Sequence, residues 1–362
     1  YDHGACDGLS VEEYVDRELA PLVGAQHKPL DQPQDVVLYG FGRIGRLSFR
    51  GIWDRYPNLE IVHVNEIKGG AKTSAYMVQY DTVHGKWREC RESTDGKSFT
   101  VDGKAVTFSD KEKIGDVDWK GMGCQMVLEC TGNFLTVAAL QPYKDQGIEK
   151  VIVSAPMKEG ILNVVMGVNC SKITPDMQII TCASCTTNCL APVVKVIHEK
   201  LTIVRGMITT IHDVTGTQAL VDQCDTGKKQ DLRRGRSGLV NLSPTSTGSA
   251  TAIAEVFPEL KGKLNGLAIR VPICNGSLTD CVFDVGRETT AEEVNGLLKQ
   301  AAEGELKGIL GFEERPLVST DFINEDRSGV VDGPSTMVVQ VQTLTHSLPH
   351  SHTLSYTKEY HR

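Results

Sequence analysis

The sequence has 362 residues, of which 40% are hydrophobic, and this is enough for two domains of ordinary size with separate cores. Its 38 basic and 46 acidic residues give a formal net charge of -8, which argues against nonspecific binding to nucleic acid or to an anionic membrane. No apolar run approaches the roughly eighteen residues of a membrane-spanning helix, and the acidic start lacks the basic and apolar regions of a signal peptide.

The number of cysteines and the identity of the first residue give information about the cellular compartment of the protein. The 11 cysteines are odd in number and match no Cys/His spacing of a zinc site. We therefore predict reduced thiols, no bound metal and a cytoplasmic location. The sequence begins at Tyr1 rather than Met, which leaves an organellar form open.

Residues 1–34 are polar and contain three prolines. One segment, "VEEYVDRELAPLV", has the apolar spacing of a short amphipathic helix. We predict that residues 1–34 form an N-terminal extension.

Residues 35–184 alternate short β-branched runs with helical stretches. The runs include "VVLY" (36–39), "IVHV" (61–64), "MVLEC" (126–130) and "KVIVSAP" (150–156). Strands separated by helices pair in parallel, so we predict an α/β, Rossmann-type doubly wound sheet that forms a dinucleotide-binding domain.

Residues 185–342 contain longer strand-like segments, such as "RGMITTIHDVTG" (205–216) and "TMVVQVQ" (336–342), together with helical stretches. This pattern predicts an α+β catalytic domain with a mixed or antiparallel sheet. Residues 343–362 form a separate, atypical C-terminal tail in this interpretation.

The first motif is "YGFGRIGR", which places Gly40, Gly42 and Gly45 in a G-x-G-x-x-G pattern between a strand and a helix. The first glycine permits a tight turn, the second permits close approach of a pyrophosphate, and the third permits the helix to pack on the strand. Glu66, at the end of the second strand, supplies a carboxylate for the ribose hydroxyls and favours NAD over NADP. The alternative is a glycine-rich turn without a ligand.

The second motif is "TCASCTTNCLAP" (181–192), in which a polar turn precedes an apolar helix. Cys185 falls at the helix N-terminus, where the helix dipole lowers the pKa of a thiol. Cys189 lies one turn further on and is expected to face the core. A lone cysteine is often inert packing, so the hypothesis needs a base. His212, at the end of a later strand, offers both thiolate stabilisation and acid/base capacity.

Five segments resemble the phosphorylating glyceraldehyde-3-phosphate dehydrogenase family. They occur in the family's order over roughly residues 35–340 and are "GFGRIGR", "SCTTNC", "TTIHDVTGTQ", "PTSTGSATA" and "GKLNGLAIRVP". The resemblance implies NAD-dependent oxidation of glyceraldehyde 3-phosphate to 1,3-bisphosphoglycerate, with Cys185 as nucleophile and His212 as its base. It further implies a homotetramer in which residues 213–240 reach toward a neighbouring subunit.

The resemblance also implies the ligand-binding residues. Those expected to bind the phosphate groups of the substrate and of inorganic phosphate are Ser184, Thr186, Thr215, Thr247, Gly248 and Arg270. Those expected to bind NAD are Gly40, Gly42, Arg43, Ile44, Gly45, Glu66, Thr131 and Ser154. The run "DLRRGRSG" either adds positive charge to this site or is a solvated charged segment.

Two alternatives remain at this point. An erythrose-4-phosphate dehydrogenase has the same Cys, His and dinucleotide features but cleaves its thioester with water. An inactive relative would act as a binding protein, which the intact Cys185 and His212 disfavour.

The sequence departs from the family pattern at several places. Tyr39 stands where the family usually has Asn, Glu66 where it has Asp, and Thr217 where Asp or Asn is common. The C-terminus lacks the family's Trp-Tyr-Asp-Asn-Glu-Trp-Gly strand and the long helix that follows it. We expect instead a solvated tail, interrupted by Pro349 and without a metal-binding histidine cluster.

Overall fold

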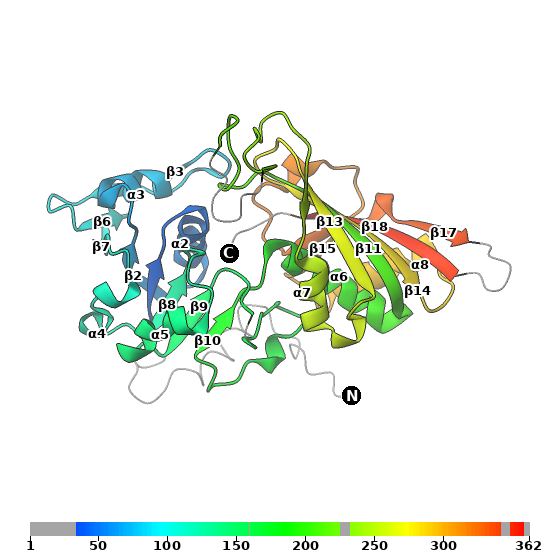
Figure 1. Cartoon of the computed structure of the whole chain (residues 1–362), viewed down its shortest axis with the longest axis horizontal. Helices are drawn as coiled ribbons and strands as arrows, with labels where there is room; N and C mark the ends of the chain where they lie inside the picture. The colour runs from blue at the N-terminus through cyan, green and yellow to red at the C-terminus, as the bar shows by residue number, and fades with distance from the viewer. Residues whose placement is uncertain (1–33, 159, 225–231, 342–347, 358–362) are drawn as a thin grey trace. The chain divides into compact units, whose positions relative to one another are not determined.

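We describe a computed structural model of the chain (Figure 1), which covers residues 34–158, 160–224, 232–341 and 348–357. The predicted N-terminal helix lies outside these residues. The chain divides into two compact units, and the boundary along the chain falls between Ser184 and Cys185. The N-terminal unit comprises the described residues up to Val164 together with Lys172–Ser184. The C-terminal unit comprises Val165–Ser171 and the described residues from Cys185 onward.

The N-terminal unit is built on an eight-stranded sheet in the order β10-β9-β8-β1-β2-β7-β6-β5. The strands are β1 (Gln34–Tyr39), β2 (Leu59–Asn65), β5 (Cys90–Glu92), β6 (Ser98–Val101), β7 (Lys104–Ser109), β8 (Met126–Glu129), β9 (Lys150–Val153) and β10 (Ile179–Thr181). Neighbours from β10 to β7 pair in parallel, and β5 and β6 add an antiparallel edge. Strand order reverses direction beside β1, and ligands bind at such switch points of open α/β sheets.

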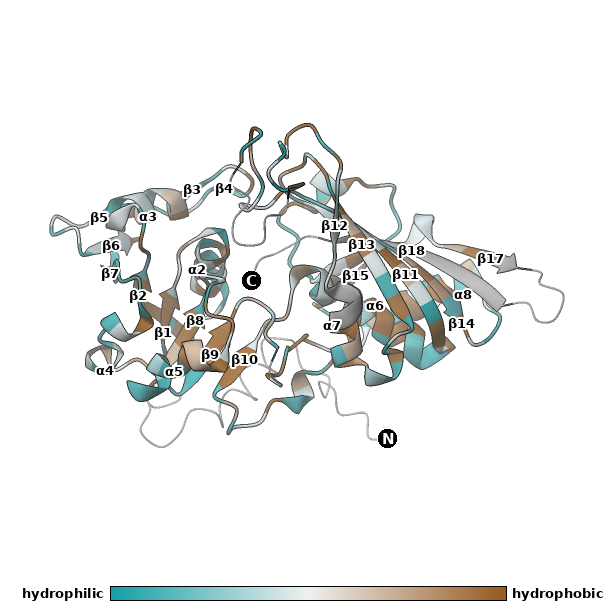
Figure 2. Ribbon diagram, in the orientation of Figure 1, coloured by the Kyte–Doolittle hydropathy of each residue, from teal (hydrophilic) through white to brown (hydrophobic). Residues whose placement is uncertain are grey.

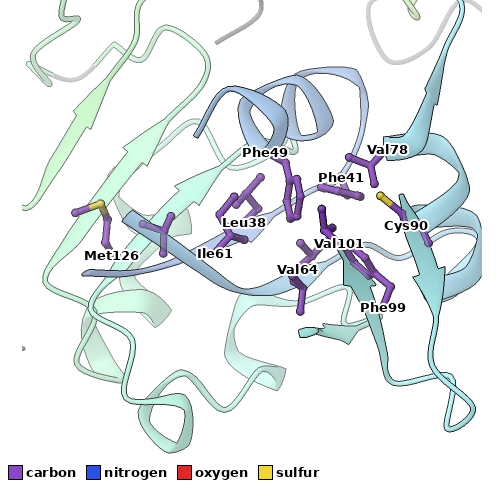
Figure 3. Packing of buried hydrophobic residues seen from close by; sticks show 13 residues of the cluster. Leu38, Phe41, Phe49, Ile61, Val64, Val78, Cys90, Phe99, Val101 and Met126 are labelled. Carbon is purple, nitrogen blue, oxygen red and sulfur yellow. The ribbon is translucent and has the colours of Figure 1, made fainter. Parts of the chain in front are cut away.

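Helices separate the strands of this sheet. They are α2 (Arg43–Arg55), α3 (Gly70–Gln79), α4 (Trp119–Met122) and α5 (Val137–Asp145), with a 3-10 turn η2 (Ile114–Asp116) and a small ribbon of β3 (Tyr80–Asp81) and β4 (Gly85–Lys86). Both faces of β1 are buried, because alternate residues enter different cores. Val36 and Leu38 join one cluster with Phe49 of α2 (Figure 3), whereas Val37 and Tyr39 join the other. Figure 2 shows the hydrophobic residues concentrated along these strands. The predicted doubly wound α/β class is confirmed.

The C-terminal unit contains a mixed sheet in the order β12-β13-β11-β14-β18-β16-β15, with β17 paired to β18. The strands are β11 (Ile203–His212), β12 (Ser243–Ser246), β13 (Leu264–Arg270), β14 (Ser277–Val285), β15 (Leu310–Glu313), β16 (Gly329–Asp332), β17 (Met337–Val341) and β18 (Leu348–Thr357). Two pairs, β11 with β13 and β15 with β16, are parallel, and the other pairs are antiparallel. The mixed sheet predicted for this region is confirmed.

Three helices pack in this unit: α6 (Cys185–Leu201), α7 (Ser249–Val256) and α8 (Ala291–Glu303). Short 3-10 turns are η3 (Cys170–Lys172), η4 (Pro258–Leu260), η5 (Ser319–Phe322) and η6 (Gly333–Ser335). Helix α6 contacts α7, α8, β14 and β16, and most of its side chains are buried. It is therefore the central helix of the unit, and its first residue is Cys185.

The end of the chain differs from the solvated tail that the sequence predicted. Residues Leu348–Thr357 form β18, which pairs with β14 from Ser277↔Thr357 to Asp284↔His350 and also with β16. Pro349 was expected to interrupt this segment, but it lies opposite Gln340 of β17, one residue before the β14 ladder begins. The hydrogen that proline lacks is thus not needed by β14. An open edge of backbone donors and acceptors on β14 favours a strand there even without alternating apolar residues.

Candidate active site

The predicted cofactor-binding residues lie at the carboxyl ends of parallel strands in the N-terminal unit. Gly40 follows β1 with φ +94, and a Cβ there would lie 2.6 Å from the backbone nitrogen of Thr131. A Cβ on Gly45 would lie 2.1 Å from the carbonyl oxygen of Gly40, whereas one on Gly42 would meet no atom within 4 Å. Packing therefore requires glycine at positions 40 and 45. No neighbouring atom requires glycine at position 42. The open space at Gly42, beside the first turn of α2, fits a pyrophosphate.

Glu66 follows β2 and lies beside this loop. Its Oε2 accepts a hydrogen bond from the backbone nitrogen of Phe41 at 2.8 Å, and its Oε1 accepts one from that of Lys68 at 3.2 Å. The carboxylate is thus fixed next to the glycine loop, where it is available to ribose hydroxyls through its remaining lone pairs. Its placement fits NAD.

Arg43 and Ile44 begin α2, so their backbone nitrogens belong to the first turn of the helix. The guanidinium of Arg43 pairs with Asp81, with Nη1 and Oδ2 2.8 Å apart. Hydrogen bonds from Arg43 and from the backbone of Val83 and His84 lower the pKa of Asp81 to about 2, against the effect of its burial. Arg43 is therefore placed to bind an anion through its backbone, since its side chain is engaged.

Thr131 and Ser154 follow β8 and β9, and both contact Glu129. The backbone nitrogen and Oγ1 of Thr131 donate to Glu129 Oε1, and the backbone nitrogen of Ser154 donates to the Glu129 carbonyl. Tyr143 donates its hydroxyl to Glu129 Oε2 at 3.0 Å. Burial of this carboxyl, which is 1% exposed, raises its pKa to about 7. Sequence reasoning missed Glu129, although a carboxylate at the end of a buried strand is a signal that could have found it.

The second group of predicted residues lies in the C-terminal unit and begins with Cys185. Thr181 ends β10, and Ala183 turns the chain with φ +55, a left-handed conformation that is uncommon outside glycine. This tight turn places Cys185 as the first residue of α6. Its Sγ lies 3.8 Å from His212 Nε2 and 3.9 Å from Thr186 Oγ1. The structure therefore brings together the predicted nucleophile and base, which are separated by 27 residues in the sequence.

His212 ends β11, and its ring is almost fully buried. Its Nδ1, on the side away from Cys185, lies 2.8 Å from the carbonyl oxygen of Asp213 and 3.0 Å from Asp213 Oδ1. Arg270 ends the parallel strand β13 directly opposite His212, and its Nη1 contacts His212 Nδ1 and donates to the Asp213 carbonyl at 3.1 Å. Parallel pairing of β11 and β13 thus explains why His212 and Arg270 meet.

The phosphate-binding residues predicted from the sequence form two groups. One group includes Thr215, which follows β11. Its Oγ1 lies 3.1 Å from that of Thr217, which is not in the predicted set. Arg234 donates to Thr217 Oγ1 at 2.6 Å. Of the other arginines in its run, Arg233 donates to the carbonyl of Pro244 and Arg236 pairs with Asp222. Arg233 and Arg236 are exposed although each has a partner, whereas Arg234 is partly buried against Thr217.

Thr247 and Gly248 form the other group, between β12 and α7. Because β12 is antiparallel to β13, Ser243 lies opposite Arg270 and the chain leaves that position before it reaches Thr247. Gly248 is instead the N-cap of α7, a helix that contacts α6. Ser184 and Thr186 flank Cys185 at the start of α6. The hydroxyls near the helix starts are thus distinct from the Thr215, Thr217 and Arg234 group.

Among the described residues, His63 and Cys189 lie apart from the site that Cys185 and His212 form. His63 lies inside β2 between Thr107 and Ser109, and burial lowers its pKa to about 4. Cys189 is 1% exposed, as predicted. In the described part of the chain, no three His, Cys, Asp or Glu residues form a group that could hold a metal ion. None of the helices described is both long and apolar enough to cross a membrane.

Comparisons with known proteins match both units. The NAD binding domain model of glyceraldehyde 3-phosphate dehydrogenase matches residues 34–137, and the model of its C-terminal domain matches residues 184–347. The chain is 56% identical over 306 residues to glyceraldehyde-3-phosphate dehydrogenase 3 of Nostoc sp., a match that covers 84% of this chain and 89% of the relative. Matches of the same coverage, at 45% identity, are glyceraldehyde-3-phosphate dehydrogenase 1 of Bacillus subtilis and the glyceraldehyde-3-phosphate dehydrogenase of Geobacillus stearothermophilus.

Proposed function

Because this chain belongs to the glyceraldehyde-3-phosphate dehydrogenase family, we propose that Cys185 and His212 catalyse its reaction, the NAD-dependent oxidation of glyceraldehyde 3-phosphate. The observation that carries the assignment is the 3.8 Å contact between Cys185 Sγ and His212 Nε2 at the start of α6. A thiol at a helix N-terminus and beside an imidazole is readily converted to a thiolate, the nucleophilic form.

Cys185 forms the covalent bond to the substrate, and His212 transfers the protons. Cys185 Sγ gives its proton to His212 Nε2 and attacks the aldehyde carbon, and His212 returns that proton to the resulting oxyanion to give a thiohemiacetal. His212 then takes the hydroxyl proton of that adduct as the carbon is oxidised to a thioester. Bound NAD supplies the hydride acceptor for this oxidation. Attack of inorganic phosphate on the thioester carbon releases the acyl phosphate and returns Cys185 as a thiolate.

Two anion-binding groups support phosphorolysis. Thr215, Thr217 and Arg234 offer hydroxyls and a guanidinium for one phosphate, and Arg270, opposite His212 at the end of β13, offers a second guanidinium. Ser184, Thr186, Thr247 and Gly248 offer hydroxyls and helix N-termini for the other. A substrate phosphate and an attacking phosphate would each have a site.

NAD would be held in the N-terminal unit by the residues that fit it. The open face of Gly42, with the first-turn nitrogens of Arg43 and Ile44, suits the pyrophosphate. Glu66 suits the ribose hydroxyls and disfavours a 2′-phosphate by charge repulsion. Gly40, Gly45, Thr131 and Ser154 shape the same edge of the sheet.

Assembly into a homotetramer and a cytoplasmic location complete the proposal. Apolar side chains are exposed on β11 and β13, where Met207 is 53% and Leu267 is 40% exposed, and on the loop that follows, at Leu220, Val221 and Val240. Exposed apolar residues of this kind are characteristic of subunit interfaces. No disulfide joins the ten cysteines in the described residues, and a reducing compartment is part of the proposal.

The direct test is the rate of NAD reduction with glyceraldehyde 3-phosphate, measured with and without inorganic phosphate. We expect turnover to depend on phosphate and to stop when Cys185 is alkylated. Turnover that needs no phosphate, and prefers erythrose 4-phosphate, would replace phosphorolysis by hydrolysis. Alkylation of Cys185 without loss of activity would remove it from the site.

A further inference from the structure

Asp213 lies next to the proposed base and is not used by the mechanism above. Its side chain is buried, and its Oδ1 lies 3.0 Å from His212 Nδ1. Cys185 faces the other ring nitrogen, Nε2. The imidazole therefore lies between a thiol and a carboxylate, with one of its two nitrogens directed at each.

Ser277, the first residue of β14, fixes this carboxylate. The backbone nitrogen of Asp213 donates to Ser277 Oγ at 3.1 Å, and Ser277 Oγ donates to Asp213 Oδ1 at 3.3 Å. Ser277 is fully buried. Since β14 pairs with β11 up to Ile211↔Leu278, the sheet itself holds Ser277 beside the residue that follows His212.

We propose that Asp213 is a positioning residue for His212. The carboxylate of Asp213 accepts the hydrogen on Nδ1 of His212 and thereby leaves Nε2 to exchange a proton with Cys185. The inference rests on the roles proposed above for Cys185 and His212. When the S–H bond of Cys185 breaks and an Nε2–H bond forms, the ring becomes a cation. A neighbouring carboxylate stabilises that cation and fixes the tautomer, as in hydrolytic triads. The Asp213 carbonyl, 2.8 Å from Nδ1, also accepts the hydrogen but carries no net charge.

The charged groups around His212 come from three elements. Cys185 belongs to α6, Arg270 to β13 and Asp213 to the end of β11, while β14 contributes the neutral Ser277. A guanidinium only donates hydrogen bonds, so the contact of Arg270 with Nδ1 requires the opposite tautomer. We assign the hydrogen on Nδ1 to Asp213, because two acceptor oxygens face Nδ1, the carbonyl at 2.8 Å and Oδ1 at 3.0 Å, and the carboxylate also stabilises the protonated ring. Arg270 has the Asp213 carbonyl as another acceptor.

The test uses the full-length enzyme with Asp213→Asn, and Ser277→Ala as a milder second variant. Asparagine keeps the shape but removes the charge. We expect kcat to fall about 10- to 100-fold with a much smaller change in KM, the range for loss of the hydrogen-bonded partner that orients a metal-binding histidine. The thiolate of Cys185, followed by its ultraviolet absorbance, should form at higher pH. Ser277→Ala should shift the same profile in the same direction by less.

Asp284→Asn is the matched control. Asp284 is also a buried carboxylate on this sheet, but it pairs with Arg205 near the other end of β11. This control should lower thermal stability and leave the thiolate profile unmoved. In the wild type, nitrogen NMR of His212 should show a proton on Nδ1.

Three results would overturn the inference: an unprotonated Nδ1 in the wild type, a thiolate profile that Asp213→Asn and Ser277→Ala leave unchanged, or an equal shift in the Asp284→Asn control. These outcomes are separable from failure of the proposed function, which would appear as an active enzyme after alkylation of Cys185.

Discussion

The glycine loop before α2 and the turn before α6 both place a helix N-terminus at the carboxyl end of a strand. In the first, Gly40 has φ +94, a Cβ there would lie 2.6 Å from the backbone nitrogen of Thr131, and Gly42 leaves open space. In the second, Ala183 bends the chain with φ +55 and the helix begins with the sulfur of Cys185. The first site therefore depends on glycines, which have no side chain, and the second depends on the side chain of Cys185.

This difference predicts opposite responses to small changes. An added methyl group should damage the glycine loop, through packing or through ligand access. A change of one atom at Cys185 should leave packing intact and remove the chemistry.

Exchange of sulfur for oxygen in Cys185→Ser should have the largest effect. We expect dehydrogenase activity to fall below about 1% of wild type, since loss of a nucleophile costs several orders of magnitude. Thermal stability should be unchanged within about 0.5 kcal/mol, because the substitution is nearly isosteric. Steady-state kinetics and thermal unfolding measure both, and a well-folded variant with substantial turnover would contradict the covalent route.

His212→Asn should have the next largest effect. We expect kcat to fall by roughly 10²- to 10⁴-fold, the usual contribution of a positioned acid or base. Slow alkylation of Cys185 should persist, with its pH profile shifted upward because the imidazolium that stabilises the thiolate is gone. An alkylation profile identical to that of the wild type would show that His212 does not act on Cys185.

Gly40→Ala and Gly42→Ala form a matched pair for the other site. We expect Gly40→Ala to destabilise the protein by about 1–3 kcal/mol, because its methyl group meets backbone atoms and its φ is left-handed. Gly42 has φ -67 and free space, so Gly42→Ala should change stability by less than about 0.5 kcal/mol. It should instead weaken NAD binding about 10-fold or more, because the methyl group would occupy the pyrophosphate position. Thermal unfolding and NAD titration separate the two effects, and equal responses would break the comparison.

Contiguous features were predictable from the sequence, and features that depend on distant backbone were not. The β1, glycine loop and α2 sequence is readable because strand, turn and helix follow one another within 22 residues, Gln34–Arg55. The pairing of Cys185 with His212 followed from each lying at the end of an element. The role of Asp213 could not be read, since successive residues of a strand point to opposite faces and only the end of β11 at His212 brings both together.

The strand β18 also could not be predicted from the sequence. Its residues, "LPHSHTLSYT", lack the apolar alternation by which strands are recognised. In the sheet it joins β14 to β16 and so links the two halves of the C-terminal unit. The edges of β14 and β16 favour a strand between them, and the paired positions of β14 lie 66 to 80 residues away from β18 in the sequence.

Glu129 is a buried titratable group in the N-terminal unit, and its predicted effect is confined to a narrow range of pH. Burial raises its pKa from an ordinary value of 4.5 to about 7, although Thr131 and Tyr143 donate hydrogen bonds to it. Between these two pH values Glu129 holds a proton in the folded protein that the unfolded chain has released. The stability that this proton contributes is fully present below pH 4.5 and declines as the pH rises toward 7. Glu129→Gln keeps the acceptor for Thr131 and lets the amide donate to the Tyr143 hydroxyl, which removes the titration. We expect the variant to lose roughly 1–3 kcal/mol less stability than the wild type between pH 4.5 and 7.5, as measured by urea unfolding at each pH. Parallel declines of the two proteins across this interval would mean that Glu129 is ionised throughout, held by its three hydrogen-bond donors rather than neutralised by burial.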